Sequence, residues 1–134
     1  MFVIVDKSNS SIHREPSKRS YASTQYKSAS AAKAGITRTI KYYNKAKAQV
    51  AEVVANGEKE YAAPMHNAYR DATDPYLGRT HCADVDNYVV MSYVDYKAIE
   101  PMVERTNMMT GKKFKESINT PHYMSASSET YWSA

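Results

Sequence analysis

The chain has very little leucine. Leu77 is the only one among 134 residues, and leucine, isoleucine, valine and phenylalanine together account for only 19 residues. A content this low, combined with a high net charge, is typical of disordered chains. The net charge here is only +4, and twelve tyrosines and seven methionines add side chains that can be buried. We therefore expect a single folded domain over residues 1–134 with a thin core, whose stability depends partly on a partner or on self-association.

Cysteine is scarce as well, and long apolar runs are absent. The lone Cys82 excludes an internal disulfide framework and is typical of a reducing compartment. No stretch reaches the roughly 18 consecutive apolar residues that indicate a membrane-spanning helix. The apolar run at the N-terminus covers only residues 2–5, and Asp6 follows it, so we expect no signal peptide. These absences favour the cytoplasm of whatever cell makes the protein, and no contact with a membrane.

Positive charge is concentrated in the N-terminal part of the chain. Residues 1–57 carry ten Lys/Arg against three Asp/Glu, whereas residues 58–134 carry eight against eleven. A basic segment attracts polyanionic partners, here nucleic acid or an acidic host protein. A solvated basic helix face is the alternative interpretation of the same pattern.

One long amphipathic helix is predicted over residues 28–56. Apolar side chains recur there at helical spacing in a single stripe, and Arg38, Lys41 and Lys45 fall nearly opposite. A serine hydroxyl is expected to cap the start, and Gly57 suits the end because glycine adopts the left-handed conformation without steric cost. The stripe consists of Ala29, Ala32, Ile36, Ile40, Tyr43, Val50 and Val54.

Two residues do not fit this helix pattern. Gly35 costs about 1 kcal/mol relative to alanine inside a helix. Lys47 falls within the apolar stripe, so either its ammonium group extends to solvent or the helix bends near Asn44.

Around the helix, the sequence predicts an α+β domain with a small, mostly antiparallel sheet. Short apolar or alternating runs indicate strands, and two of them separated by a connection with Gly111 indicate a C-terminal β-hairpin. The run over residues 87–99 is apolar or aromatic on both faces, which favours a central strand. The other predicted elements are strands at 2–5, 12–14 and 21–27, a short helix at 65–73, an irregular loop at 76–86, and hairpin strands at 102–107 and 113–118.

The candidate binding residues combine basic side chains with tyrosines. Aromatic faces beside cations are typical of grooves that bind single-stranded nucleic acid, and tyrosine also anchors protein interfaces. Some tyrosines must instead fill the leucine-poor core, and Tyr43 on the helix stripe is the clearest case. The residues predicted to bind nucleic acid or a protein partner are Arg38, Lys41, Lys45, Tyr42, Lys18 and Arg19.

The loop over residues 80–86 concentrates side chains that carry chemistry. It holds His81, Cys82 and two carboxylates, which are metal-ligand types, but no second Cys/His pair stands at zinc-finger spacing. A nucleophilic cysteine needs a histidine base in space, and the adjacent His81 is poorly placed for that role. We therefore expect no metal, no cofactor and no catalytic residue, and we keep a small enzyme using the His81–Asp86 loop as an alternative.

Aromatic residues end the chain. A disordered terminus is usually depleted in aromatics, whereas this one carries Tyr131 and the only tryptophan, Trp132. We predict that both rings dock, either on their own domain or on a neighbouring subunit of a homo-oligomer.

Two stretches of the chain, covering roughly a third of it, resemble small uncharacterised proteins encoded by tailed bacteriophages. They are residues 27–38 (KSASAAKAGITR) and residues 103–134, in which RTNMMTGK at 105–112, NTP at 119–121 and SSETYWS at 127–133 are the most specific. The resemblance implies a phage origin, a small size and a location in the cytoplasm of the infected host. It brings no active site. The sequence thus predicts a non-enzymatic phage accessory protein that acts by binding, with a capsid, tail or connector accessory of the virion as the alternative.

Overall fold

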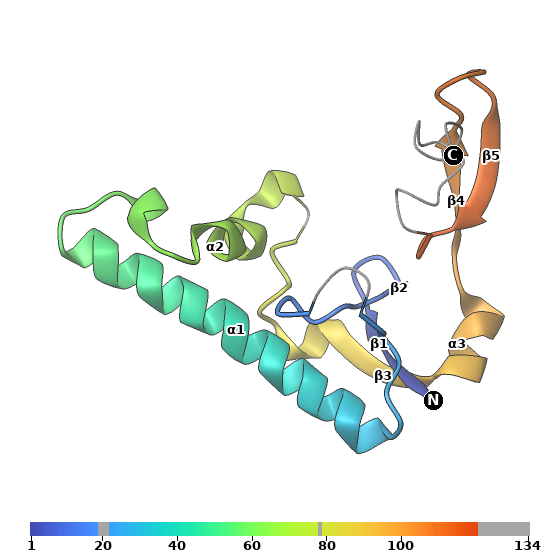
Figure 1. Ribbon diagram of the computed structural model, residues 1–134, viewed down its shortest axis with the longest axis horizontal. Coiled ribbons are helices and arrows are strands. Elements are labelled where there is room, and N and C mark those ends of the chain that lie inside the picture. The colour runs from blue at the N-terminus through green and yellow to red at the C-terminus, as the bar shows by residue number, and fades with distance from the viewer. Residues whose placement is uncertain (19–21, 78, 121–134) are drawn as a thin grey trace.

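The computed structural model describes residues 1–18, 22–77 and 79–120. The fold is α+β, as predicted, with small antiparallel sheets and one dominant helix, α1 (Ala29–Ala55). Figure 1 shows α1 lying along the molecule, with a three-stranded sheet against its first half and a hairpin beyond that sheet, at the end of the molecule away from the C-terminus of α1. Within the described part of the chain, no helix is both long and apolar enough to cross a membrane.

The central strand of the sheet is the first strand of the chain. β1 (Phe2–Asp6) pairs antiparallel with β2 (Ser11–Ile12) on one edge and with β3 (Tyr88–Ser92) on the other. The register sets Phe2 opposite Ser92 and Asp6 opposite Tyr88. The middle residues of β1, Val3, Ile4 and Val5, are buried because α1 and a shorter helix cover the two faces.

Helix α1 begins and ends close to the predicted residues. The Ser28 hydroxyl accepts a hydrogen bond from the amide of Ala31 at 3.1 Å, and Gly57 follows the helix with φ of 82°. The helix runs without a break through Asn44 and Lys47. Its buried residues confirm most of the predicted stripe, and they are Ala32, Gly35, Ile36, Thr39, Tyr43, Ala46 and Val50.

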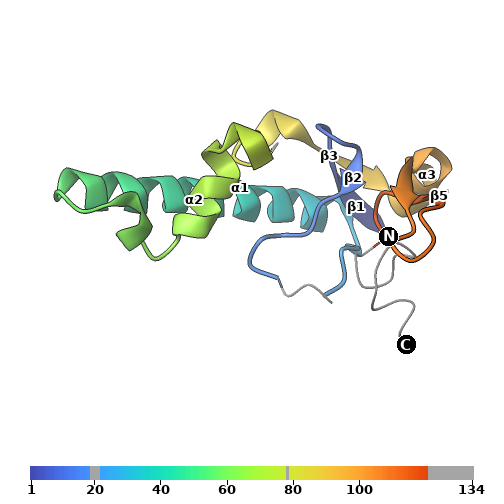
Figure 2. The ribbon, with the colours of Figure 1, turned by 90° about the horizontal axis from the view of Figure 1, so that it is seen from above.

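The predicted stripe is wrong at its C-terminal end. Val54 is 49% exposed. Figure 2 shows the end of α1 extending past the sheet, so the sheet does not cover the last turn of the helix.

Gly35 has a packing role that the sequence pattern did not reveal. A Cβ atom at this position would lie 2.7 Å from the hydroxyl oxygen of Tyr26 and 3.0 Å from Cδ1 of Ile4. The absence of a side chain therefore lets α1 approach β1 and the segment that carries Tyr26. The stabilisation from this close packing compensates for the low helix propensity of glycine.

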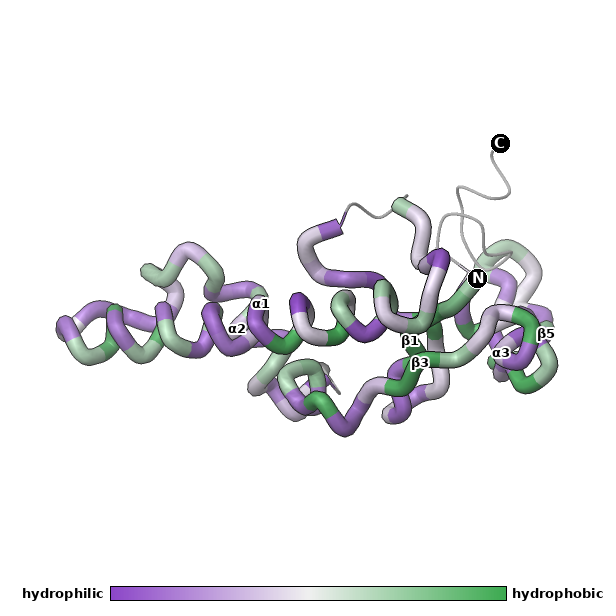
Figure 3. The backbone as a smooth tube through the Cα atoms, turned by 90° about the horizontal axis from the view of Figure 1, so that it is seen from below, coloured by the Kyte–Doolittle hydropathy of each residue, from purple (hydrophilic) through white to green (hydrophobic). Residues whose placement is uncertain are grey.

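Tyrosine and alanine fill much of the core in place of leucine. One cluster lies between α1 and the sheet, a second between α1 and α2 (His66–Thr73), and a third where α3 (Tyr93–Ile99) covers the other face of β1. Figure 3 shows apolar residues of β1 and β3 beside α1. The buried members are, in order, Ile4, Tyr26, Ala32, Ile36 and Tyr88; Tyr43, Ala46, Ala68 and Ala72; and Val3, Val5 and Tyr96.

The single long strand predicted over residues 87–99 is wrong. The chain forms β3 and then turns directly into α3, and β3 lies at an edge of the sheet rather than at its centre. The change occurs at Ser92, whose hydroxyl accepts a hydrogen bond from the amide of Asp95 at 3.1 Å. This side-chain cap provides a helix start that outweighs the β propensity of the valines and tyrosines around it.

The remaining elements agree in part with the sequence. The short helix is confirmed as α2, and the C-terminal hairpin is confirmed as β4 (Met102–Thr106) and β5 (Lys113–Ser117). Of the strand predicted over residues 21–27, the described residues 22–27 form only an isolated bridge, between Tyr26 and Phe2. The connecting segments contain three short 3-10 helices, η1 (Glu60–Ala62), η2 (Pro75–Leu77) and η3 (Val85–Asn87).

Asn119 fastens the end of the described chain to the N-terminal sheet. Its Oδ1 accepts a hydrogen bond from the amide of Ile12 at 2.7 Å, and its Nδ2 donates to Tyr96 and to Glu100 at 2.8 Å each. The chain therefore returns from the hairpin to β2 and α3. The predicted docking of Tyr131 and Trp132 lies outside the described residues.

Candidate binding groove on the long helix

An open groove of about 630 Å³ lies along the middle of α1, where η3 approaches the helix. Most of its lining is apolar. Helix residues three, four, seven and eight positions apart share one face, which is why five of the lining residues come from α1. The groove is lined by Thr37, Ile40, Lys41, Asn44, Lys45 and Val85.

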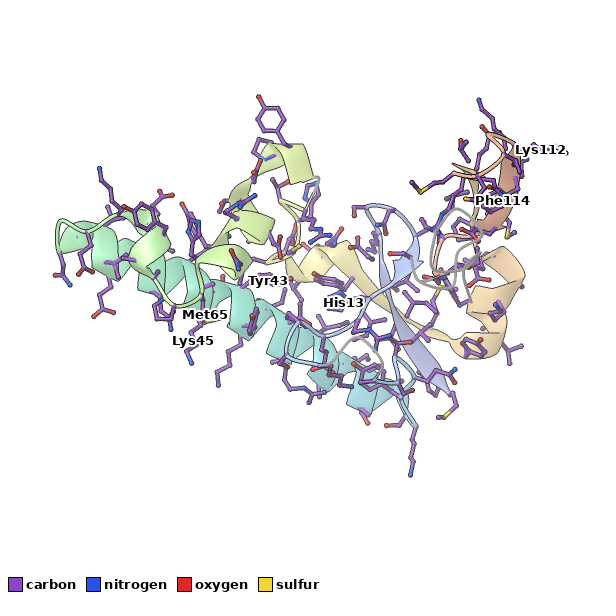
Figure 4. The ribbon with its side chains drawn as sticks, turned by 45° about the horizontal axis from the view of Figure 1, so that its top comes forward. His13, Tyr43, Lys45, Met65, Lys112 and Phe114 are labelled. Atoms are coloured by element: carbon purple, nitrogen blue, oxygen red, sulfur yellow. The ribbon has the colours of Figure 1, made fainter. Side chains whose placement is uncertain are left out.

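Aliphatic side chains and two lysines meet in this groove. Ile40 is half-buried and packs against the core cluster under α1, while Val85 of η3 is 58% exposed. Lys41 and Lys45 are exposed and stand one helical turn apart. Among the described residues, no carboxylate lies within ion-pair distance of either ammonium group. Figure 4 shows Lys45 extending from α1, away from His13 and Tyr43.

Two other predicted binding residues, Arg38 and Lys18, form ion pairs within the protein. The carboxylate of Glu15 is 2% exposed and accepts hydrogen bonds from Arg38 Nε at 2.6 Å, from Arg38 Nη2 at 3.0 Å and from the Tyr26 hydroxyl at 2.5 Å. Lys18 Nζ lies 3.2 Å from the same carboxylate and 4.7 Å from the centre of the Tyr26 ring. Arg38 and Lys18 therefore hold the segment before α1 in place.

The environment of Glu15 favours its charged form. Burial alone would raise its pKa, but the hydrogen bonds from Arg38, Tyr26 and Lys18 outweigh burial and lower the pKa to about 2. Glu15 is thus ionised over the whole physiological pH range, and its negative charge offsets part of the positive charge that the sequence predicts on this side of α1.

Tyr42 belongs to the packing between helices. Its ring lies edge-on to that of Tyr43, with 5.4 Å between ring centroids and 86° between planes, and it packs against the cluster between α1 and α2. Arg19 lies outside the described residues. Of the six residues predicted to bind, Lys41 and Lys45 are therefore the two that the structure brings together at an open groove.

Sequence reasoning missed the apolar half of the groove. Ile40 belongs to the predicted apolar stripe, and its spacing does not indicate that its side chain also lines a groove. Val85 stands between Asp84 and Asp86 in a segment without periodicity, so no pattern indicates that it faces α1.

A second, more enclosed pocket of about 200 Å³ brings His13 and Cys82 to one polar site. Cys82 belongs to the loop over residues 80–86, and His13 is one of three distant histidines, with His66 and His122, that could join that loop only if the fold brought them together. Figure 4 shows His13 and Tyr43 near this region, between the N-terminal segment and α1. The pocket is lined by Asp6, Ser8, Asn9, His13, Arg14, Tyr43, Arg79, His81, Cys82, Asn87 and Tyr88.

The protonation states in this pocket do not favour nucleophilic catalysis. Burial raises the pKa of the Cys82 thiol, and burial lowers the pKa of His13. An activated cysteine requires the reverse, a thiolate beside an imidazolium. The Thr39 hydroxyl donates to the carbonyl of Gly35 at 3.0 Å, so at 3.0 Å from His13 it accepts a hydrogen bond from Nε2–H. This contact places a proton on Nε2 of His13, and burial favours the neutral imidazole because it lowers the pKa.

Hydrogen bonds within the pocket join separate segments of the chain. Asp6 accepts from Nδ2 of Asn87 at 2.9 Å, and the Tyr88 hydroxyl donates to the carbonyl of Cys82 at 2.8 Å. Residues 1–18, 22–77 and 79–120 contain no group of three His, Cys, Asp or Glu side chains that could hold a metal ion. The two hydrogen bonds connect β1 with η3 and β3 with the loop before η3.

Comparison of the chain with protein-family models, with curated proteins and with solved structures gives no significant match.

Proposed function

We propose that the protein is a non-enzymatic bacteriophage accessory protein that binds an acidic macromolecule of the host through the groove on α1. The observation that supports this proposal is the pair of lysines, Lys41 and Lys45, at the edge of an open and mostly apolar groove. A charged group that is already paired within the protein attracts a partner only weakly. Among the described residues, neither of these two ammonium groups has a carboxylate within ion-pair distance.

The two kinds of surface in the groove have separate roles in binding. The lysines attract a negatively charged partner over a distance of about 10 Å at moderate ionic strength. Ile40 and Val85 lose water when the partner arrives, and burial of apolar surface contributes about 25 cal/mol per Å². Attraction sets the rate of encounter and burial holds the complex together.

A role in the assembly of the virion is the second candidate function. It is favoured by exposed apolar side chains on α3 and β4, far from the groove: Val94 is 79% exposed, Ile99 62% and Met102 57%. Exposed apolar side chains lose water when another subunit covers them, which favours contacts between subunits. Mass spectrometry of purified virions tests this candidate directly, because an assembly component remains in the particle.

The binding proposal is tested with two simple polyanions, single-stranded oligothymidylate and polyglutamate. Replacing Lys41→Glu and Lys45→Glu together is expected to weaken binding of at least one of them. The matched control is Lys112→Glu with Lys115→Glu, which makes the same change of charge in the hairpin. If both double variants lose affinity equally, only net charge matters and the groove is not the binding surface.

Salt dependence gives an independent measurement for the oligothymidylate. Each lysine that contacts a phosphate of a single strand adds about 0.7 to the log–log slope of affinity against salt. Loss of both lysines is therefore expected to reduce the slope by about 1.4, and the hairpin control is expected to leave it nearly unchanged.

A further inference from the structure

We infer that the partner of the α1 groove is a protein segment that presents an aliphatic side chain between carboxylates. This inference rests on the proposed function, since it names the partner of the same groove. It is drawn from three properties of the lining: the kind of apolar surface, the kind of cations and their spacing.

The apolar surface is aliphatic rather than aromatic. Ile40 and Val85 supply it, and none of the described residues that line the groove is aromatic. Grooves for single-stranded nucleic acid hold bases by stacking them on aromatic rings. Tyr42, the nearest candidate on α1, packs instead into the cluster with α2. Branched aliphatic side chains fit another aliphatic side chain, such as leucine or isoleucine.

The cations are two lysines without an arginine. Arginine is the residue best suited to phosphate because its planar fork makes two parallel hydrogen bonds. Arg38, the arginine in the middle of α1, directs its guanidinium to Glu15. A lysine ammonium acts as a point charge and pairs readily with single carboxylates.

The spacing of the lysines matches a helical partner. Lys41 and Lys45 lie four residues apart, so they occupy adjacent turns on one side of the groove. Carboxylates four residues apart on a partner helix have the same separation, and an aliphatic residue three positions after the first carboxylate adjoins them on the same face, where it would meet Ile40 and Val85. This is the arrangement by which an amphipathic helix binds an apolar groove.

Three fluorescent probes of equal net charge test the inference at one ionic strength. The first is a designed helical peptide with leucine along one face and glutamate on the flanks. The second is the same peptide with serine in place of leucine, and the third is an oligothymidylate. The leucine peptide is expected to bind about tenfold more tightly than the serine peptide, because burial of one leucine is worth at least that factor.

Variants of the protein locate the contact. Val85→Ser is expected to weaken binding of the leucine peptide severalfold and to leave the oligothymidylate unaffected. Val94→Ser is the matched control, since Val94 is also exposed but lies on α3. Neither substitution disturbs a buried side chain, and circular dichroism checks that both variants remain folded.

The outcomes separate this inference from the proposed function. If the oligothymidylate binds more tightly than the leucine peptide, or if both peptides bind equally, the partner class is wrong while the function stands. An equal effect of the two valine substitutions also overturns the partner class. If Lys41→Glu with Lys45→Glu changes the affinity for none of the probes, the proposed function itself fails.

Discussion

Arg38 of α1 meets the buried carboxylate of Glu15 through two hydrogen bonds, 2.6 Å from Nε to Oε1 and 3.0 Å from Nη2 to Oε2. The Glu15 carboxylate also accepts a hydrogen bond from the Tyr26 hydroxyl and forms an ion pair with Lys18. Three side chains thus surround one buried charge, two of them as cations and the third as a neutral hydrogen-bond donor. Loss of one partner is expected to lower the free energy of unfolding strongly, because a charge or a polar group is then left buried without a partner.

Acid is expected to destabilise the protein through Glu15. Its pKa is about 2 in the folded protein, below the ordinary value of 4.5. The carboxylate therefore stabilises the fold fully above about pH 4.5, and this contribution is lost as the pH falls toward 2. Glu15→Gln should lower the free energy of unfolding by about 2–3 kcal/mol at pH 7, since Arg38 is half exposed and can turn to solvent.

Urea unfolding at pH 7 and pH 3 measures this effect. The difference between wild type and Glu15→Gln should shrink at the lower pH. Glu104→Gln is the matched control, because Glu104 forms an exposed ion pair with Lys113 that is worth about 1 kcal/mol or less. Equal losses in the two variants would show that Glu15 is not specially stabilised.

Gly35→Ala is expected to destabilise the protein by about 1–3 kcal/mol, although alanine is the better helix former. The new Cβ would lie 2.7 Å from the hydroxyl of Tyr26, which is itself fixed by Glu15. In a Tyr26→Phe background, which lacks that oxygen, the same substitution should cost less. A double-mutant cycle by thermal unfolding measures the difference, and additive effects would contradict the close contact.

Ile36→Ala is expected to cost more than Ile40→Ala. Ile36 is 9% exposed inside the cluster between α1 and the sheet, so its truncation leaves a cavity and costs about 2–4 kcal/mol. Ile40 is only half-buried and opens onto the groove, so the loss should be about 1–2 kcal/mol. Chemical unfolding of both variants gives the order, and the reverse order would mean that the face of α1 is wrongly assigned.

Asn119→Ala is expected to destabilise the contact between the end of the hairpin and β2 by about 2–3 kcal/mol. The substitution removes the acceptor of the Ile12 amide and the donor to Tyr96 and Glu100. Hydrogen exchange at the Ile12 amide should accelerate more than exchange in the middle of α1. Uniform acceleration over the whole chain would instead indicate global destabilisation.

Cys82 is expected to react slowly with iodoacetamide. Burial raises the pKa of the thiol, so the reactive thiolate is rare at pH 7. Tyr43→Phe should slow the reaction further at a given pH, because the Tyr43 hydrogen bond lowers the Cys82 pKa. A thiol that reacts faster than that of an unfolded peptide at pH 7 would instead favour the alternative of a small enzyme.

Elements with a local cause were predictable from the sequence. The phase of α1 follows from apolar spacing between Ala32 and Val50, and the hairpin follows from two short runs around Gly111, whose φ is 71°. The stretch after Asn87 was not predictable in this way. Its side chains favour a strand throughout, and a single capping serine, Ser92, changes its structure halfway along.

Of the residues that line the candidate groove, only the two lysines were predicted from the sequence as binding residues. Lys41 and Lys45 are visible on the polar side of the helix pattern, but Val85 reaches the groove from a segment forty residues away. The engagement of Arg38 depends on Glu15, which lies before the helix in a segment with no periodicity. Contacts between distant segments leave no spacing signal in a single sequence, so the distinction between a paired and an unpaired cation required the structure.

The pairing of β1 with β3 has a consequence for how the chain folds. β1 is synthesised before its longer partner β3 and can pair with it only after residue 92 has been made, because Phe2 lies opposite Ser92. Until then β1 is an apolar strand with one free edge, and α1 is a helix whose buried face has no complete sheet to cover. Closing so long a loop is slow compared with forming a helix, so folding is expected to end, rather than begin, with the sheet at the centre of the molecule.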